Sequence, residues 1–155
     1  MAITRTLAGL TLVATATLTL TALTAQAANA ASGPWGPYYA PGQAAKATGT
    51  LTATGEDHAD LPTADVVRVS GKVQDNTRGA ACGWAVFRIT YRSGNELPNR
   101  EHWARDCSYR TPKQFSFKYR HVYQVELKVC SERKAAKPSL NCLYAGTWKT
   151  LYLSK

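Results

Sequence analysis

Four cysteines set the strongest limit on the fold of this chain. They are Cys82, Cys107, Cys130 and Cys142, and they follow an N-terminal stretch with the features of an export signal. In an exported domain of this size, an even number of cysteines indicates two disulfide bonds more readily than a metal site or a reactive thiol. We therefore expect a secreted domain that two disulfides stabilise, without a metal or another cofactor.

The export signal is predicted over residues 1–30. Arg5 precedes an uncharged, apolar stretch from Leu7 to Ala25, and small residues suited to a signal peptidase follow it. This stretch contains six threonines, and no basic cluster follows it before Lys46. Both features favour a cleaved signal peptide over a transmembrane anchor. We expect an extracellular protein with no transmembrane anchoring.

Positive charge is concentrated in the C-terminal part of the chain. Residues 76–155 carry fifteen basic and five acidic side chains, whereas residues 31–75 carry three basic and five acidic ones. Such a field favours an anionic partner, for example a wall polymer or an acidic polysaccharide, and solubility alone is the alternative explanation. Removal of residues 1–30 leaves 155 − 30 = 125 residues, which suits one domain, expected to be a monomer.

The first part of the exported chain is rich in proline and glycine. Residues 31–49 include Trp35, Tyr38 and Tyr39 but cannot form a long helix, so we expect an extended arm before a domain over residues 50–155. An acidic segment over residues 56–65 lacks the ordered ligand series and the turn glycine of a calcium loop. It is therefore expected to be a solvated loop.

Alternating apolar and polar residues predict β-strands in the rest of the chain. Strands are expected over residues 50–54, 67–74, 82–92, 115–130 and 143–153. The fourth of these is the strongest signal, and its length predicts a bend between Arg120 and Tyr123. Residues 93–113 contain many turn formers and are expected to be a long connection. No segment predicts a helix.

These patterns predict an all-β fold, a single immunoglobulin-like β-sandwich of about six or seven antiparallel strands with two disulfides. The stretch from Tyr123 to Cys130 resembles the penultimate strand of such a sandwich, although a true immunoglobulin domain has its tyrosine where this chain has Lys128. Taken whole, the chain resembles small exported β-sandwich proteins of actinomycetes with no assigned activity. The carrying features are the alanine-rich signal, the segment 69–75 before Cys82, and the late cysteines; the resemblance implies a fold and a compartment only.

Four cysteines allow three disulfide connectivities, which the sequence does not distinguish. We favour Cys82 with Cys107 and Cys130 with Cys142. The second pair would close a short loop between adjacent strands, worth roughly 3 kcal/mol in the chain-entropy model. A bond between Cys82 and Cys130, which would bridge two sheets, is the rival.

The favoured function is that of a non-enzymatic binding protein with a basic and aromatic surface. Strand alternation places seven basic side chains on outward faces, where they could join two aromatic residues and bind an anionic polymer or a glycan. These candidates are Arg68, Lys72, Arg88, Arg92, Lys118, Arg120 and Lys128, with Trp103 and Tyr109. If these residues lie on different sheets, they form no common patch.

Two other classes of protein fit the sequence. A protease inhibitor or protein-interaction module could present residues 131–141, with Arg133 and Lys134 as its contact residues. A small secreted hydrolase is the third class, because Leu97 to Glu101 resembles pieces of secreted microbial ribonucleases, but in the wrong order. The histidines do not lie in a catalytic string, and His121 has the parity of a core-facing residue.

Overall fold

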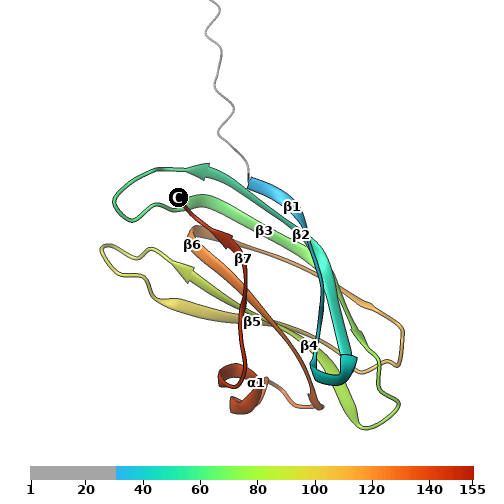
Figure 1. Cartoon of the computed structure of the whole chain (residues 1–155). Coiled ribbons are helices and arrows are strands. Elements are labelled where there is room, and N and C mark those ends of the chain that lie inside the picture. The colour runs from blue at the N-terminus through green and yellow to red at the C-terminus, as the bar shows by residue number, and fades with distance from the viewer. Residues whose placement is uncertain (1–30) are drawn as a thin grey trace, which may run out of the picture.

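A computed structural model describes residues 31–155; the predicted signal peptide at residues 1–30 lies outside the described residues (Figure 1). Within this part of the chain, seven strands pair antiparallel in one sheet, accompanied by one 3-10 turn and one short helix. The elements are β1 (Ala31–Tyr39), η1 (Pro41–Gln43), β2 (Ala45–Glu56), β3 (Ala64–Asp75), β4 (Ala81–Tyr91), β5 (Asn99–Asp106), β6 (Lys113–Arg133), α1 (Leu140–Tyr144) and β7 (Lys149–Leu153).

The long strand β6 joins the two halves of the sheet. The strand order is β1-β2-β3-β6-β4-β5, and β7 also pairs with β6. The N-terminal half of β6 pairs with β3, and its C-terminal half pairs with β4 and β7. The change of partner occurs at Val122, which pairs with both Ala64 and Tyr91, next to His121 with a φ of 53°. The bend expected between Arg120 and Tyr123 is therefore confirmed.

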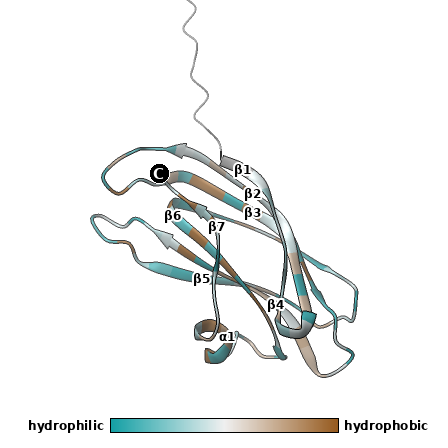
Figure 2. Cartoon of the chain, in the orientation of Figure 1, coloured by the Kyte–Doolittle hydropathy of each residue, from teal (hydrophilic) through white to brown (hydrophobic). Residues whose placement is uncertain are grey.

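The sheet curls until its two ends face each other. Trp35 lies on β1, at one end of the strand order, and Phe87 lies on β4, next to the strand at the other end, yet their ring centroids are 5.9 Å apart. Figure 1 shows β1, β2 and β3 on one side of the molecule and β4 and β5 on the other. The inner face forms one buried core with residues from β1 to β7. In β6, apolar residues of this core alternate with hydrophilic ones (Figure 2).

The all-β class, the antiparallel pairing and the two disulfides are confirmed. The hydrogen-bond ladder joins all seven strands in one sheet, whereas we expected a sandwich of two. Cys82 pairs with Cys107, and Cys130 pairs with Cys142, which is the connectivity that we favoured. Disulfides persist in oxidising compartments, so these pairs indicate an extracellular or otherwise oxidising environment. No helix within residues 31–155 is long and apolar enough to cross a membrane.

A second, smaller core covers the outer face of β4. Trp84 and Val86 point away from the main core and are fully buried beneath the C-terminal segment, which contributes Cys142 and Leu143. Helix α1 begins at an N-cap, because the Ser139 hydroxyl accepts a hydrogen bond from the Cys142 N–H at 3.2 Å. The C-terminal segment therefore acts as a lid on the outer face of the sheet.

Three segments differ from the sequence-based expectation. The expected connection over residues 93–113 contains β5, a polar edge strand that only β4 pairs. Residues 31–49, expected as an arm, form β1, η1 and the first part of β2, with Trp35 buried in the core. The expected last strand over residues 143–153 is divided between the end of α1 and β7. Each of these segments is ordered by its neighbours in space and not by an alternation of its own.

Candidate anion-binding face

Three adjacent strands place basic side chains in register on one outer face. In the row Thr52, Arg68 and Lys118, the three residues are direct neighbours across β2, β3 and β6. Two residues along, Thr50, Ser70 and Ser116 form the next row. Lys72 follows in the third row between Thr48 and Gln114, and Arg120 lies opposite Val66 at the other end.

No acidic residue balances these charges. The outward positions of residues 46–54, 66–74 and 114–120 contain no Asp or Glu and no aromatic residue. Arg68, Lys72, Lys118 and Arg120 are exposed, and the ion pairs found within residues 31–155 involve other residues. Lys46 lies beside this group, opposite Gln74. We call the set Arg68, Lys72, Lys118 and Arg120 the cationic face.

The spacing of the cationic face follows from sheet geometry. Directly opposite residues have Cβ atoms about 5 Å apart, so Arg68 and Lys118 repel each other. Lys118 and Arg120 are two residues apart, or about 7 Å, whereas Arg68 and Lys72 are about 13 Å apart. Between them, the hydroxyls of Ser70 and Ser116 are 3.0 Å apart. The arrangement offers separated cations and neutral hydrogen-bonding groups to an extended anion.

Arg88 and Lys128 lie on a different face, beneath the C-terminal lid. The Arg88 guanidinium lies 4.1 Å from the Trp148 ring centroid, and the Lys128 ammonium lies 4.6 Å from it. Lys128 also donates to the carbonyl oxygens of Leu143 at 3.2 Å and Ala145 at 2.6 Å. It is only 7% exposed, and burial together with Arg88 lowers its pKa. The outward parity of Lys128 was correct, but the inference that it is accessible was wrong.

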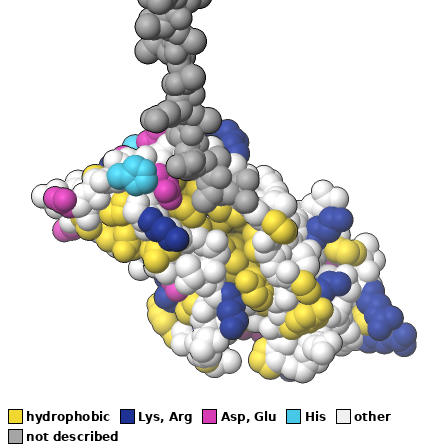
Figure 3. Space-filling model, turned by 45° about the horizontal axis from the view of Figure 1, so that its top comes forward, with side chains coloured by type: hydrophobic (Ala, Val, Ile, Leu, Met, Phe, Trp, Pro, Cys, Tyr) yellow, Lys and Arg dark blue, Asp and Glu magenta, His cyan; other side chains and the backbone are white. Residues whose placement is uncertain are grey.

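The remaining candidate residues make their own contacts outside the cationic face. Arg92 forms an ion pair with Asp57, and Trp103 is exposed on β5. The guanidinium groups of Arg78 and Arg110 lie 5.0 Å and 5.2 Å from the centroid of the Tyr109 ring. In the view of Figure 3, Lys and Arg side chains occupy several separate places and do not form one continuous area. Arg88 and Lys128, beneath the C-terminal lid, are therefore separated from the cationic face, and this view shows no single basic and aromatic patch.

Arg133 and Lys134, the residues of the inhibitor hypothesis, are both exposed at the end of β6. The loop after them is held at its far end, since the Glu132 carboxylate accepts hydrogen bonds from the N–H of Ser139 at 2.8 Å and its hydroxyl at 2.6 Å. Arg105 also donates to the carbonyl oxygen of Ala135. The loop is thus exposed but anchored.

The histidines do not converge. The His102 ring packs 4.0 Å from the Phe117 ring, and burial lowers the pKa of His102. His121 is exposed, in contrast to its core-facing parity, because the bend in β6 rotates this residue away from the core. His58 lies 3.0 Å from the backbone oxygen of Lys155. Within residues 31–155, no group of three or more His, Cys, Asp or Glu residues is placed to hold a metal ion.

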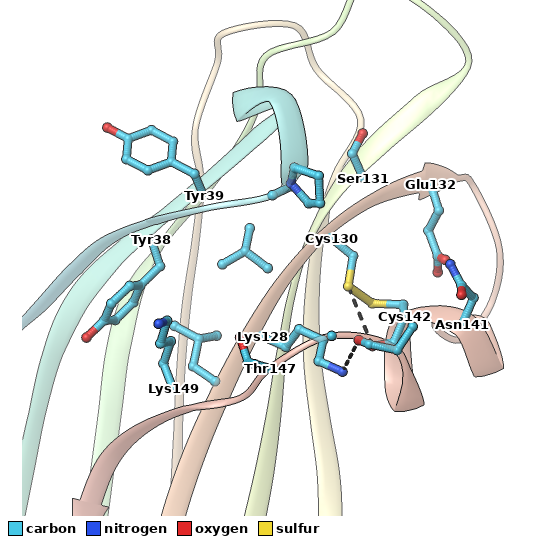
Figure 4. Close-up of a pocket in the computed structure, with 16 residues that line it drawn as sticks. Tyr38, Tyr39, Lys128, Cys130, Ser131, Glu132, Asn141, Cys142, Thr147 and Lys149 are labelled. Carbon is cyan, nitrogen blue, oxygen red and sulfur yellow. Dashed lines mark hydrogen bonds between the residues drawn. A yellow bond between two sulfur atoms is a disulfide. The ribbon is translucent and has the colours of Figure 1, made fainter.

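Sequence reasoning missed one further feature, a cavity of about 540 Å³ between the end of β1 and the C-terminal half of β6 (Figure 4). Tyr38 and Tyr39 lie on one side of it, and the Cys130–Cys142 disulfide lies on the other. The aromatic pair was the only signal in the sequence, because the opposite wall depends on strand pairing.

Comparison of this chain with models of known protein families, with curated proteins and with solved structures gives no match.

Proposed function

We propose that this protein is secreted and that it binds an anionic extracellular polymer through the cationic face. The observation that carries the proposal is the alignment of Arg68 and Lys118 on neighbouring strands with Lys72 and Arg120 nearby and no acidic side chain among them. Like charges directly opposite each other destabilise a sheet. An anion lying across the row would relieve this repulsion, so the face is suited to a negatively charged ligand.

The chemistry of the face favours recognition of charge over recognition of bases. Its outward positions carry hydroxyl and amide groups between the cations but no aromatic ring on which a base could stack. A polyanion with sulfate, phosphate or carboxylate groups along its length can satisfy both the cations and the hydroxyls. The two disulfides support a location outside the cell.

The proposal extends to the architecture. We infer a distant relation to immunoglobulin-like sandwiches, supported by the alternation from Tyr123 to Cys130 and by the curl of the sheet over one core. In such a sandwich the cationic face is one outer surface, so a long polymer can lie across it without entering the molecule.

Heparin serves as the probe in a direct test. We expect the wild-type protein to be retained on immobilised heparin and to elute as salt rises, because counterions compete with the polyanion. In the variant Arg68→Ala/Lys118→Ala, the slope of log affinity against log salt concentration should fall by about two, one for each lost contact.

The matched control is Arg133→Ala/Lys134→Ala, which removes the same charge from an exposed loop. It should retain most of the wild-type salt dependence. An equal loss in both double variants would mean that net charge alone binds heparin, and elution of the wild type at very low salt would contradict the proposal directly.

A further inference from the structure

The C-terminal half of β6 has an unpaired edge. Strand β7 pairs with β6 only from Gln124 to Leu127, where Leu127 lies opposite Lys149. Strand β6 continues to Arg133, and β4 follows it on the other side over this whole length. Beyond Leu127, no strand within residues 31–155 pairs with the second edge of β6.

The backbone groups at this edge can be identified from the alternation along the strand. The Tyr123 carbonyl accepts a hydrogen bond from Ser154 on the β7 side at 2.8 Å. The Tyr91 N–H bonds to Pro98 on the β5 side, so the even-numbered residues of β4 bond to the even-numbered residues of β6. The odd-numbered residues Val129 and Ser131 therefore direct their N–H and C=O groups away from β4.

This edge borders the cavity at the end of β1. Val129 and Ser131 line the cavity together with Tyr38, Tyr39 and Pro41. Figure 4 shows the two tyrosines on one side of the cavity and Cys130 on the other. Its volume of about 540 Å³ lies within the range of ligand pockets. Because β7 is antiparallel to β6, this space lies where an N-terminal extension of β7 before Lys149 would pair with β6.

We propose that an extended peptide segment of another protein binds here by adding a strand to β6 at Val129 and Ser131. The N–H and C=O groups of Val129 and Ser131 give two donors and two acceptors at a spacing of about 7 Å, which matches the backbone of a strand. A sugar has no such repeat of donors and acceptors. Leu127, Val129 and the Cys130–Cys142 disulfide offer apolar contacts to one side chain of the peptide. The proposal is independent of the cationic face, which lies on β2, β3 and the other half of β6.

Charge complementarity defines the peptide further. Lys149 is exposed and lines the cavity, whereas the carboxylate of Glu132, also in the lining, already accepts two hydrogen bonds from Ser139. Lys128 also lines the cavity, so the lining carries two cations against one carboxylate and its net charge is positive. The preferred segment carries an acidic residue next to an apolar or β-branched one in an extended stretch of about four residues.

The test uses a library of acetylated, amidated hexapeptides that alternate β-branched and polar residues and contain one acidic position. Affinity selection on the full exported protein should enrich peptides with the acidic residue beside an apolar one. With the strongest selected peptide, amide hydrogen exchange at Val129 and Ser131 should slow in the wild-type protein. This readout requires no variant to fold.

Two substitutions at one position isolate the backbone contact. Ser131→Pro removes an N–H that does not bond to β4, and it should weaken peptide binding at least about tenfold. Ser131→Ala keeps the N–H and should bind within about twofold of the wild type. Arg68→Ala/Lys118→Ala should bind the peptide normally, which separates this site from the polymer-binding face.

Three results would overturn the proposal. One is a library from which no peptide is enriched. Another is a selected peptide that leaves the exchange of both amides unchanged. The third is a neutral oligosaccharide that slows exchange at Val129 and Ser131 when the peptides do not, because the cavity would then be a glycan site.

Discussion

At the scale of single residues, the core depends on a gap that two glycines leave beneath Trp35. Trp35, Gly49, Gly71 and Phe115 form one row across β1, β2, β3 and β6. A Cβ atom added at Gly71 would lie 2.5 Å from the Thr48 carbonyl oxygen, 2.8 Å from the Trp35 ring and 2.9 Å from the Phe115 ring. All three contacts are shorter than real Cβ atoms make, so the backbone of β2 and the two rings have to move. Alternation with Val69 and Val73 predicts that Gly71 faces the core. It does not predict that the indole of Trp35 occupies the space above Gly71.

We therefore expect Gly71→Ala to destabilise the protein by about 1–3 kcal/mol, the usual cost of inserting a methyl group into a filled core. Urea denaturation followed by Trp fluorescence measures the change in the free energy of unfolding. Gly33→Ala is the control, because a Cβ at Gly33 meets no atom within 4 Å. Equal stability of Gly71→Ala and wild type would mean that neither the Thr48 backbone nor the indole is held against Gly71.

At the scale of elements, β6 shows what strand alternation predicts and what it does not. Its alternating apolar residues predicted the strand, because every second side chain faces the core. The length of this alternating run predicted the bend. The polar strand β5 has no such alternation, since β4 alone pairs with it at the edge of the sheet. Helix α1 is stabilised by its N-cap and by the disulfide at Cys142, so its five residues gave no periodic signal.

The bend itself can be tested at His121. Its φ of 53° lies in the left-handed region, which costs a residue with a Cβ atom about 1–2 kcal/mol. His121 is exposed, so its side chain adds no core contact. We expect His121→Gly to raise the free energy of unfolding by up to about 1 kcal/mol, after the greater flexibility of glycine in the unfolded chain is included.

Gln124→Gly is the matched control, because Gln124 lies on the same strand, pairs with Thr90 and Leu153, and does not have a positive φ. It should lower stability by roughly 0.5–1 kcal/mol. Chemical denaturation of both variants gives the comparison. A loss of stability in His121→Gly as large as in Gln124→Gly would show that the bend does not depend on the conformation of this residue.

At the scale of the whole molecule, the candidate site shows why alternation along a strand does not by itself predict which side chains are exposed. Alternation placed Arg68, Lys118 and Lys128 outward, and all three side chains do leave the main core. Arg68 and Lys118 are exposed because no segment of residues 31–155 covers their face, whereas the C-terminal lid buries Lys128. Contacts between distant parts of the chain decide which strands lie side by side. They also decide which face of the sheet a later segment covers. These contacts leave no local pattern in the sequence.

A contact between distant segments also closes the curled sheet at one end. The loop between β2 and β3 reaches the end of β4, where Arg92 donates to the Asp57 carboxylate at 2.5 Å and to the Leu61 carbonyl at 2.9 Å. The Asp57 carboxylate also accepts a hydrogen bond from the Thr63 N–H at 2.9 Å. The Thr63 bond first, and then Arg92, lower the pKa of Asp57 from 3.8 to about 2. The charged form of Asp57 therefore stabilises the folded state.

The sign of this linkage gives a prediction for acid. Because the pKa of Asp57 is lower in the folded state, its contribution is complete above about pH 4 and is lost as the pH falls toward 2. Asp57→Asn should melt at a lower temperature than the wild type at pH 6. The loss of free energy of unfolding should be less than about 1 kcal/mol, because the pair is exposed to solvent. Thermal melts between pH 2 and 7 should show this difference shrinking below pH 4.

Asp60→Asn, which changes an exposed side chain without a hydrogen bond among residues 31–155, should show no such pH-dependent difference. A constant gap between Asp57→Asn and wild type down to pH 2 would mean that the carboxylate charge does not hold the loop to β4.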